Sequence, residues 1–369
     1  IMKYDFDKVI DRNGTAAVKL EEAKEVWGRA DLIPLWVADM DFATAPFVTE
    51  AIRKRCENEV LGYTGKPDSY YNAIINWVKQ RYDLTVAKEM INFVPGIVPG
   101  IGMAMNCFTR KGDKVMIQPP VYHPFAWVTT RNERTLVTNP LKWENGMYRM
   151  DLDAFREQIK GCKLFILCNP HNPGGVVWRE EELSAIADIC YDEKVLVFSD
   201  EIHADLTLPP HKHRPFATIS EKARMNSVTF MSPSKAFNMP GLSASHAIIF
   251  NEELQRQFRT YIDAGELDMG HVFAFLSVEA AYSHGTEWLD QCLAYIQGNI
   301  DYVDEFLKFH TPKIKAIRPE ASYLVWLDCR ELGLTQEALN DFFVDKAHLA
   351  LNDGAMFGKE GTGFMRLNV

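Results

Sequence analysis

Short apolar runs alternate with helical periods along the middle of this chain. Four such runs, rich in β-branched and aromatic residues, lie at 114–118, 163–168, 194–199 and 227–231. They are continuously apolar instead of alternating, which is typical of parallel strands that are covered on both faces. Apolar residues at helical spacing in 151–160 and 180–191 predict helices between them. The alternation predicts an α/β fold with a mostly parallel central sheet covered by helices.

The C-terminal third shows a different pattern. Apolar residues at helical spacing predict one long helix over 287–309, followed by a strand at 322–328 and a helix at 335–347. We expect the long helix to link the central sheet to a second unit. No linker rich in Pro, Gly or Ser divides the chain, so the two units should pack closely.

The segment before Ala45 has no strand–helix alternation of its own. A length of 369 residues is typical of two domains at roughly 150 residues each. We therefore expect a large domain over 45–285 and a smaller α+β domain over 286–369, which the N-terminal segment 1–44 joins.

Composition removes several classes of function. The formal charge is 40 − 50 = −10, and the chain shows no basic cluster, so nucleic acid is not expected as a partner. No stretch reaches the roughly 18 apolar residues that a membrane-spanning helix needs. Acidic residues near the start (Asp5, Asp7) occupy the place of a secretory apolar region. The seven cysteines form an odd set without a C-x-x-C pair, which is typical of reduced core residues in a cytoplasmic protein.

Candidate chemistry follows three of the predicted strands, where ligands of open parallel sheets bind. Asn172 lies in an Asn-Pro-His-Asn-Pro-Gly-Gly loop at 169–175, Asp200 directly follows a strand, and Lys235 stands in Ser-Pro-Ser-Lys. Taken singly, they could be a turn, a helix cap and a surface lysine. Glu201, His203 and Asp205 could also suggest a metal site, but their spacing is not that of zinc ligands, so we expect no metal.

Together these three residues form the set that holds pyridoxal 5′-phosphate: a lysine for the aldehyde, a carboxylate for the ring nitrogen and a donor for the ring oxygen. The glycine-rich segment 94–102 leads into a helix and could bind the phosphate through backbone N–H groups. Tyr122, directly after a strand, could stack on the ring. Ser232 and Ser234 could add hydroxyl donors, and Arg366 is a candidate receptor for a substrate carboxylate.

With these residues in place, the chain resembles fold type I pyridoxal-phosphate enzymes of the class I/II aminotransferase superfamily, from about Tyr4 to Val369. Within that superfamily, Leu-Trp-Val-Ala-Asp-Met-Asp-Phe at 35–42 and Asp-Glu-Ile-His at 200–203 are similar to the MalY/PatB branch of cystathionine β-lyases. The segment 319–328 also fits this branch.

The resemblance implies a role for each matching residue. Lys235 would bind the cofactor and move the α-proton, Asp200 would pair with the ring nitrogen, Asn172 with the ring oxygen, and Tyr122 would stack on the ring. The remaining matches are Ile97 and Val98 in the phosphate loop, Arg366 and Ala38 at the substrate, and Tyr63, which would reach the phosphate of a neighbouring subunit. The resemblance therefore implies a homodimer with shared active sites.

Three departures from the aminotransferase pattern follow from the comparison of motifs. His203 stands where aminotransferases usually carry tyrosine, as in the lyase branch. Ser243 stands where an arginine usually pairs with the phosphate, so we expect backbone and hydroxyl donors to bind that group. Family members usually continue with a terminal helix, so we expect that helix to be missing after Val369.

The leading hypothesis is a carbon–sulfur β-lyase that converts L-cystathionine or related L-cysteine S-conjugates to pyruvate, ammonia and a thiol. The same lysine could instead return the proton to the cofactor, which would make the protein an aminotransferase. A third possibility is a regulatory protein of the same fold that binds a transcription factor. The leaving group and the role of His203 stay open at this point.

Overall fold

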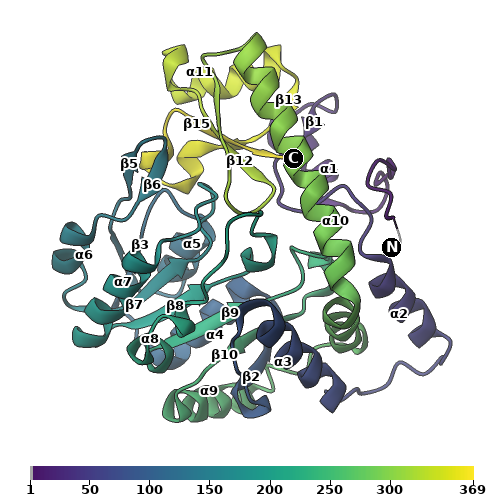
Figure 1. The fold of residues 1–369 in the computed structure, drawn as a ribbon, viewed down its shortest axis with the longest axis vertical. Coiled ribbons are helices and arrows are strands. Elements are labelled where there is room, and N and C mark those ends of the chain that lie inside the picture. Colours follow the sequence, from purple (N-terminus) through teal and green to yellow (C-terminus); the bar gives the residue numbers. More distant parts are fainter. Residues whose placement is uncertain (1–2) are drawn as a thin grey trace.

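The computed structural model describes residues 3–369, and a seven-stranded sheet organises its larger part (Figure 1). The strands follow the order β2-β10-β9-β8-β7-β3-β4. Their bounds are β2 Ile91–Val94, β3 Lys114–Ile117, β4 Thr135–Thr138, β7 Cys162–Cys168, β8 Leu196–Asp200, β9 Ser227–Met231 and β10 Ser245–Ile248. Only β10 runs antiparallel to its neighbours, so the other six strands share one direction and end at the same edge. The predicted α/β class is confirmed.

Helices cover both faces of this sheet (Figure 1). The helices of the larger part are α2 Pro46–Cys56, α3 Asp68–Tyr82, α4 Ile97–Phe108, α5 Pro124–Arg131, α6 Leu152–Gln158, α7 Glu180–Asp192, α8 Glu221–Met225 and α9 Glu252–Gly265. Strands β7, β8 and β9 are almost wholly buried, as expected for parallel strands between two helical layers. A small hairpin, β5 Lys142–Glu144 with β6 Met147–Arg149, lies apart from the main sheet.

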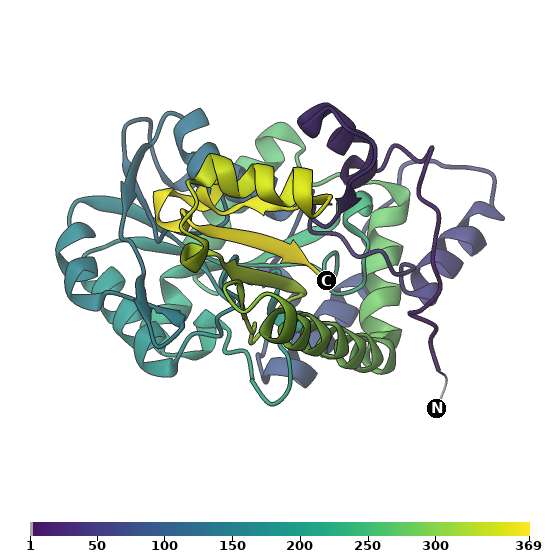
Figure 2. The same ribbon diagram turned by 90° about the horizontal axis from the view of Figure 1, so that it is seen from above.

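The C-terminal part forms a second, four-stranded sheet of order β11-β12-β15-β14. The helices and strands of the C-terminal part are β11 Lys315–Ile317, β12 Leu324–Asp328, α11 Gln336–Asp341, β13 Leu349–Ala350, β14 Asn352–Asp353 and β15 Phe364–Asn368. The N-terminal segment joins this part, because β1 Ile33–Pro34 pairs in parallel with β13. Helix α1 Val18–Trp27 precedes β1 and lies next to the yellow C-terminal helix in Figure 2.

Helix α10, Val272–His310, is the long connection between the two sheets (Figures 1 and 2). The predicted period over 287–309 is part of it, and Leu289, Leu293, Ile296 and Ile300 are buried as the period requires. The helix begins 15 residues earlier than the pattern indicated, so it runs across the predicted boundary at 285–286.

The other predicted elements are present within a few residues of their predicted bounds. The segment predicted as a helix over 335–347 consists of α11 and a π-helical turn, Phe342–Lys346. The sequence did not predict β2, β4, β10 and β15. These strands are four or five residues long, which is too short to show a clear hydrophobic period. Ile1 and Met2, the start of the predicted N-terminal segment, lie outside the described residues. No helix within 3–369 is long and apolar enough to cross a membrane.

Candidate active site

The residues that follow β7, β8 and β9 line one cavity of about 480 Å³. The register places the last residues of β7 and β8, Cys168 and Asp200, side by side. The turn after β9 brings Lys235 to the same edge, and the loop after β7 brings Asn172. The three polar groups that the sequence predicted at strand ends therefore face a common space.

Asp200 is a buried carboxyl group at this edge. One oxygen accepts the Ile202 N–H over 3.1 Å, and no ion pair forms at this carboxylate within residues 3–369. Burial raises the Asp200 pKa to about 7, against the smaller opposing effects of the Ile202 N–H and the Lys235 charge. A cation placed against this carboxylate would therefore be bound strongly.

Lys235 is the matching buried amine. Burial and, to a smaller extent, the nearby Arg366 charge lower its pKa to about 8, whereas Asp39 and Asp200 oppose this shift. Its Nζ donates to the Ala38 carbonyl oxygen over 2.5 Å. An amine with a pKa this close to neutrality is partly uncharged near pH 8 and can act as a nucleophile or a base.

Arg366 lies in the middle of β15, paired in register with Trp326 on β12 and Asn352 on β14. Its guanidinium donates to the Asn172 side-chain oxygen (3.1 Å), the Asn352 side-chain oxygen (2.7 Å) and the Trp36 carbonyl (3.2 Å). Its Nε is buried and has no hydrogen-bond partner among residues 3–369. Burial lowers the Arg366 pKa to about 10, so the group stays charged and has a donor left for an anion.

The turn between β2 and α4 forms the opposite end of the cavity, with Gly96, Ile97 and Val98 on its surface. The first N–H groups of α4 have no partner inside the helix, and a helix N-terminus favours an anion. Ser234, Ser243 and Ser245 also line the cavity, and Ser245 is paired in register with Val94 on β2, directly before this turn. This end can hold a phosphate without an arginine.

Tyr122 and His203 line the remaining walls. The Tyr122 backbone N–H donates to the Asn172 carbonyl over 3.0 Å, and burial raises the pKa of its phenol to about 12, so the phenol stays neutral. His203 is buried, and its Nδ1 has no hydrogen-bond partner in the part of the chain that the structure describes. Burial, with the Lys235 and Arg366 charges, lowers its pKa to about 3. The imidazole is therefore neutral near pH 7.

Two predicted site residues lie elsewhere. The Ser232 hydroxyl does not line the cavity: it donates to the Ala244 carbonyl (2.9 Å) and accepts the Ser234 N–H (3.1 Å), which fixes the turn that carries Lys235. The Tyr63 side chain is 99% exposed and lies in a separate surface hollow with Lys66 and Asp268. Within one chain, Tyr63 does not contact the cavity.

Each carboxylate near His203 has a partner other than His203. Glu201 pairs with His213 over 2.6 Å, and Asp205 accepts the Trp77 indole N–H over 3.1 Å. Within residues 3–369, no group of three His, Cys, Asp or Glu side chains is arranged to hold a metal.

The sequence reading missed several residues of the cavity wall: Trp36, His123, Trp127, Asn352 and Met356. His123 packs edge-on against Trp127, with ring centroids 4.5 Å apart. The spacing of His123 and Trp127, four positions apart at the start of α5, was an available signal. Asn352 carries no sequence signal, since only the pairing of β14 with β15 brings it to Arg366.

Fold and site together define a pyridoxal-phosphate type of active site on a two-part α/β scaffold. The family model for class I and II aminotransferases matches residues 30–369, and the chain belongs to that family. It is 41% identical to cystathionine beta-lyase PatB of Bacillus subtilis, over 99% of this chain and 95% of PatB.

Two solved structures are also closely similar. The pyridoxal-phosphate-containing cystalysin of Treponema denticola superposes with a TM-score of 0.96 at 33% identity, covering 100% of this chain and 94% of cystalysin. The PLP-bound C–S lyase of Staphylococcus hominis superposes with a TM-score of 0.92 at 35% identity, covering 100% of this chain and 94% of that lyase. The family resemblance that the motifs indicated is confirmed.

Proposed function

We propose that this chain is a pyridoxal-phosphate-dependent carbon–sulfur β-lyase. Its substrate is L-cystathionine or a related S-conjugate of L-cysteine, and its products are pyruvate, ammonia and a thiol, which is homocysteine when cystathionine is cleaved. The observation that carries the proposal is the meeting of Lys235, Asp200, Asn172 and Arg366 around one buried cavity. The full-length identity to a cystathionine β-lyase favours this reaction among those of the family.

The cavity fits the cofactor on the chemistry of its donors. Asp200 is a buried carboxylate that forms no ion pair with any described residue and would hold the ring nitrogen, while Lys235 would bind the aldehyde carbon. Asn172 and His203 would face the ring oxygen, and Tyr122 would cover one face of the ring. When bound, the cofactor supplies an electron-accepting ring that stabilises negative charge at the substrate α-carbon.

The phosphate would lie at the N-terminus of α4. The backbone N–H groups of Ile97 and Val98 and the hydroxyl of Ser234 would bind it, and Ser232 would hold the turn that carries Ser234. Ser243, at the position where aminotransferases usually have arginine, also lines the cavity. Neutral donors and the helix dipole then replace the missing positive charge.

The chain's own residues supply the substrate contacts and the proton transfer. Arg366 would bind the α-carboxylate, with Asn172 and Asn352 holding its guanidinium in place. Ala38 would cover the substrate from the N-terminal segment. Lys235 Nζ would remove the α-proton, and elimination of the thiolate from the β-carbon follows.

Incubation of the holoenzyme with L-cystathionine tests the proposal. We expect pyruvate and free thiol to appear in equal amounts. Exchange of amino groups with 2-oxo acids, without release of pyruvate or thiol, would overturn it and make the protein an aminotransferase.

We propose further that the active protein is a homodimer in which Tyr63 of each subunit completes its neighbour's phosphate site. The support is the position of Tyr63: it is 99% exposed in a single chain, and Val60 and Leu61 beside it are also exposed. Large exposed apolar side chains that lie close together are typical of an interface.

The domain division and the compartment are also proposals. A large domain over 45–285 and a small one from 1–44 and 286–369 would place the cavity between the two, because Ala38 and Arg366 meet Asp200 and Lys235 there. The cysteines in the structure are all free and five of them are buried. Free buried thiols favour the reducing cytoplasm.

A further inference from the structure

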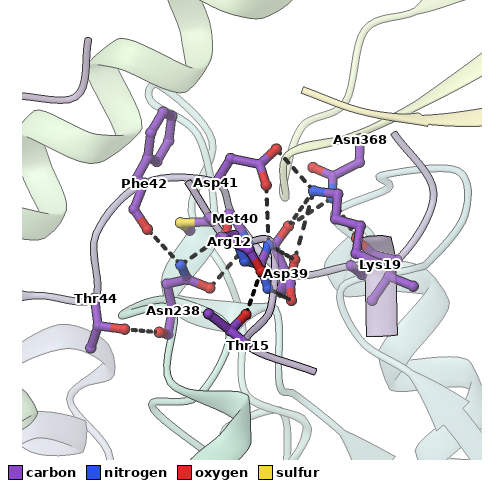
Figure 3. Close-up of polar contacts among 12 residues, drawn as sticks. Arg12, Thr15, Lys19, Asp39, Met40, Asp41, Phe42, Thr44, Asn238 and Asn368 are labelled. Atoms are coloured by element: carbon purple, nitrogen blue, oxygen red, sulfur yellow. Dashed lines mark hydrogen bonds and ion pairs between the residues drawn. The ribbon is translucent and has the colours of Figure 1, made fainter. Parts of the chain in front are cut away.

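Residues Trp36–Phe42, which we call the strap, present the Ala38 carbonyl to Lys235, and Trp36, Val37 and Ala38 line the cavity. Besides the 2.5 Å bond from Lys235 Nζ, this carbonyl accepts the Tyr323 hydroxyl over 2.9 Å. The strap contains no helix or strand, and β1 ends at Pro34, before the strap begins. Its position therefore depends on side chains that bind its backbone (Figure 3).

Asn238 holds one end of the strap. Its side-chain amide donates to the Met40 and Phe42 carbonyls (3.0 and 2.8 Å), and its side-chain oxygen accepts the Met40 N–H over 3.0 Å. The Asn238 backbone has φ 52°, a left-handed conformation that asparagine tolerates well. Asn238 follows Lys235 by three residues. One loop therefore positions both the Lys235 amine and the strap whose Ala38 carbonyl accepts a hydrogen bond from that amine.

Asn368 holds the other end. Its amide donates to the Val37 and Asp39 carbonyls, over 2.7 and 2.8 Å, which are the carbonyls on either side of Ala38. Asn368 lies two residues after Arg366 on β15, so both side chains leave the strand on the same face. Arg366 binds the Trp36 carbonyl from that face.

Charged residues also bind the strap. Arg12 forms two hydrogen bonds with the Asp39 carboxylate, at 2.7 and 3.0 Å, and Lys19 donates to the Asp39 carbonyl over 3.2 Å (Figure 3). Two asparagines and two cations thus bind the strap.

We propose that Asn238 and Asn368 are positioning residues for Lys235. Asn368 binds the carbonyls on either side of Ala38, and Asn238 binds the backbone of Met40 and Phe42. Together they fix the Ala38 oxygen as the acceptor for the lysine amine whenever that amine is not bonded to the cofactor. This inference rests on the proposed function, in which the free amine removes the α-proton.

The physical reason is the flexibility of a lysine side chain. Its rotamers must be restricted for the amine to stay near one reacting atom, and a buried amine needs an acceptor. A fixed carbonyl supplies both conditions. If the strap loosens, the amine samples positions away from the α-carbon, and proton transfer slows while substrate binding at Arg366 persists.

The experiment compares Asn238→Gly and Asn368→Ala with wild type, using holoenzyme of equal cofactor content and L-cystathionine as substrate. Glycine accepts the left-handed backbone at 238, so the first change removes only the side chain. We expect kcat to fall about tenfold or more in each variant, with KM changed less than about threefold. Hydrogen exchange of the cofactor-free protein gives a second readout: the Met40 amide should exchange at least about tenfold faster in Asn238→Gly.

Asn92→Ala is the matched control, because Asn92 is fully buried and binds the Ala247 carbonyl over 3.1 Å away from the strap. It should keep its kcat. Values of kcat within about twofold of wild type in both strap variants, or an equal loss of kcat in the control, would overturn the inference. A wild-type enzyme that releases no pyruvate would overturn the proposed function instead. Hydrogen exchange of the Met40 amide would still test whether Asn238 fixes the strap.

Discussion

The Arg366 guanidinium donates to the side-chain oxygen of Asn172 over 3.1 Å, although 194 positions separate the two residues. One lies on β15 of the small sheet and the other on the loop after β7 of the large sheet. The bond orients the Asn172 amide so that its oxygen faces Arg366 and its NH₂ group is left for another acceptor. The candidate carboxylate receptor and the candidate ring-oxygen donor therefore act as one unit.

Replacing Arg366 by lysine should weaken substrate binding more than it slows the reaction. A lysine keeps the charge but cannot hold Asn172, Asn352 and a carboxylate at once. A loss of about 2 kcal/mol corresponds to a rise in KM of about 30-fold. Steady-state kinetics with L-cystathionine measure it, and an unchanged KM would remove Arg366 from the carboxylate site.

Replacing Asp200 by asparagine should remove a pH-dependent part of the stability of the cofactor-free protein. The pKa of Asp200, about 7, lies above the ordinary Asp value near 3.8, so its contribution is full below about pH 4 and is lost as the pH rises through 7. The melting temperature of wild type should therefore fall relative to Asp200→Asn between pH 4 and 7, and the difference should stay constant above. A difference that is the same at every pH would contradict this.

His203 should not control the pH dependence of the reaction. Burial keeps its pKa near 3, so the imidazole is neutral throughout pH 5–9. We expect His203→Gln to leave the inflections in the plot of kcat against pH at the same pH values, even if kcat itself falls. The loss of an inflection between pH 6 and 7 would show that His203 titrates during turnover.

Complementation of two inactive variants tests the shared site. In the proposed dimer, each active site takes Lys235 from one subunit and Tyr63 from the other. Lys235→Ala and Tyr63→Ala therefore remove side chains that different subunits contribute to one site. After the two are unfolded together and refolded as an equal mixture, half of the dimers are mixed and each has one intact site, so about a quarter of wild-type activity should return. Mixtures that stay inactive, while each variant still dimerises in sedimentation, would place both residues in one subunit's site.

The polar residues at strand ends were predictable because the local sequence indicates which segments form buried parallel strands. Lys163–Cys168 and Lys194–Ser199 are apolar runs, and whatever follows a parallel strand lies at the edge where ligands bind. The long helix was also predictable from local sequence, because its apolar residues recur at helical spacing over 287–309. The positions of Asp200 and Lys235 at one cavity follow directly from those two signals.

Contacts between distant segments were not predictable in this way. Asn352 and Asn368 carry no local signal, and they reach Arg366 and the strap only through the register of β14 and β15. The exact start of α10 was missed because Gly285 and the small residues around it weaken the helical period, yet Gly285 packs directly under Phe237. Sequence reading thus located the chemistry, and tertiary register determined what holds it in place.

Reduction of the holoenzyme with borohydride, followed by peptide mass mapping, tests the central claim most directly. A cofactor joined to Lys235 through a carbon–nitrogen double bond becomes permanently attached on reduction, so we expect one phosphopyridoxyl group per chain, on the peptide that contains Lys235. No attachment at all, or attachment at another lysine while Lys235→Ala retains full lyase activity, would contradict the assignment of this cavity.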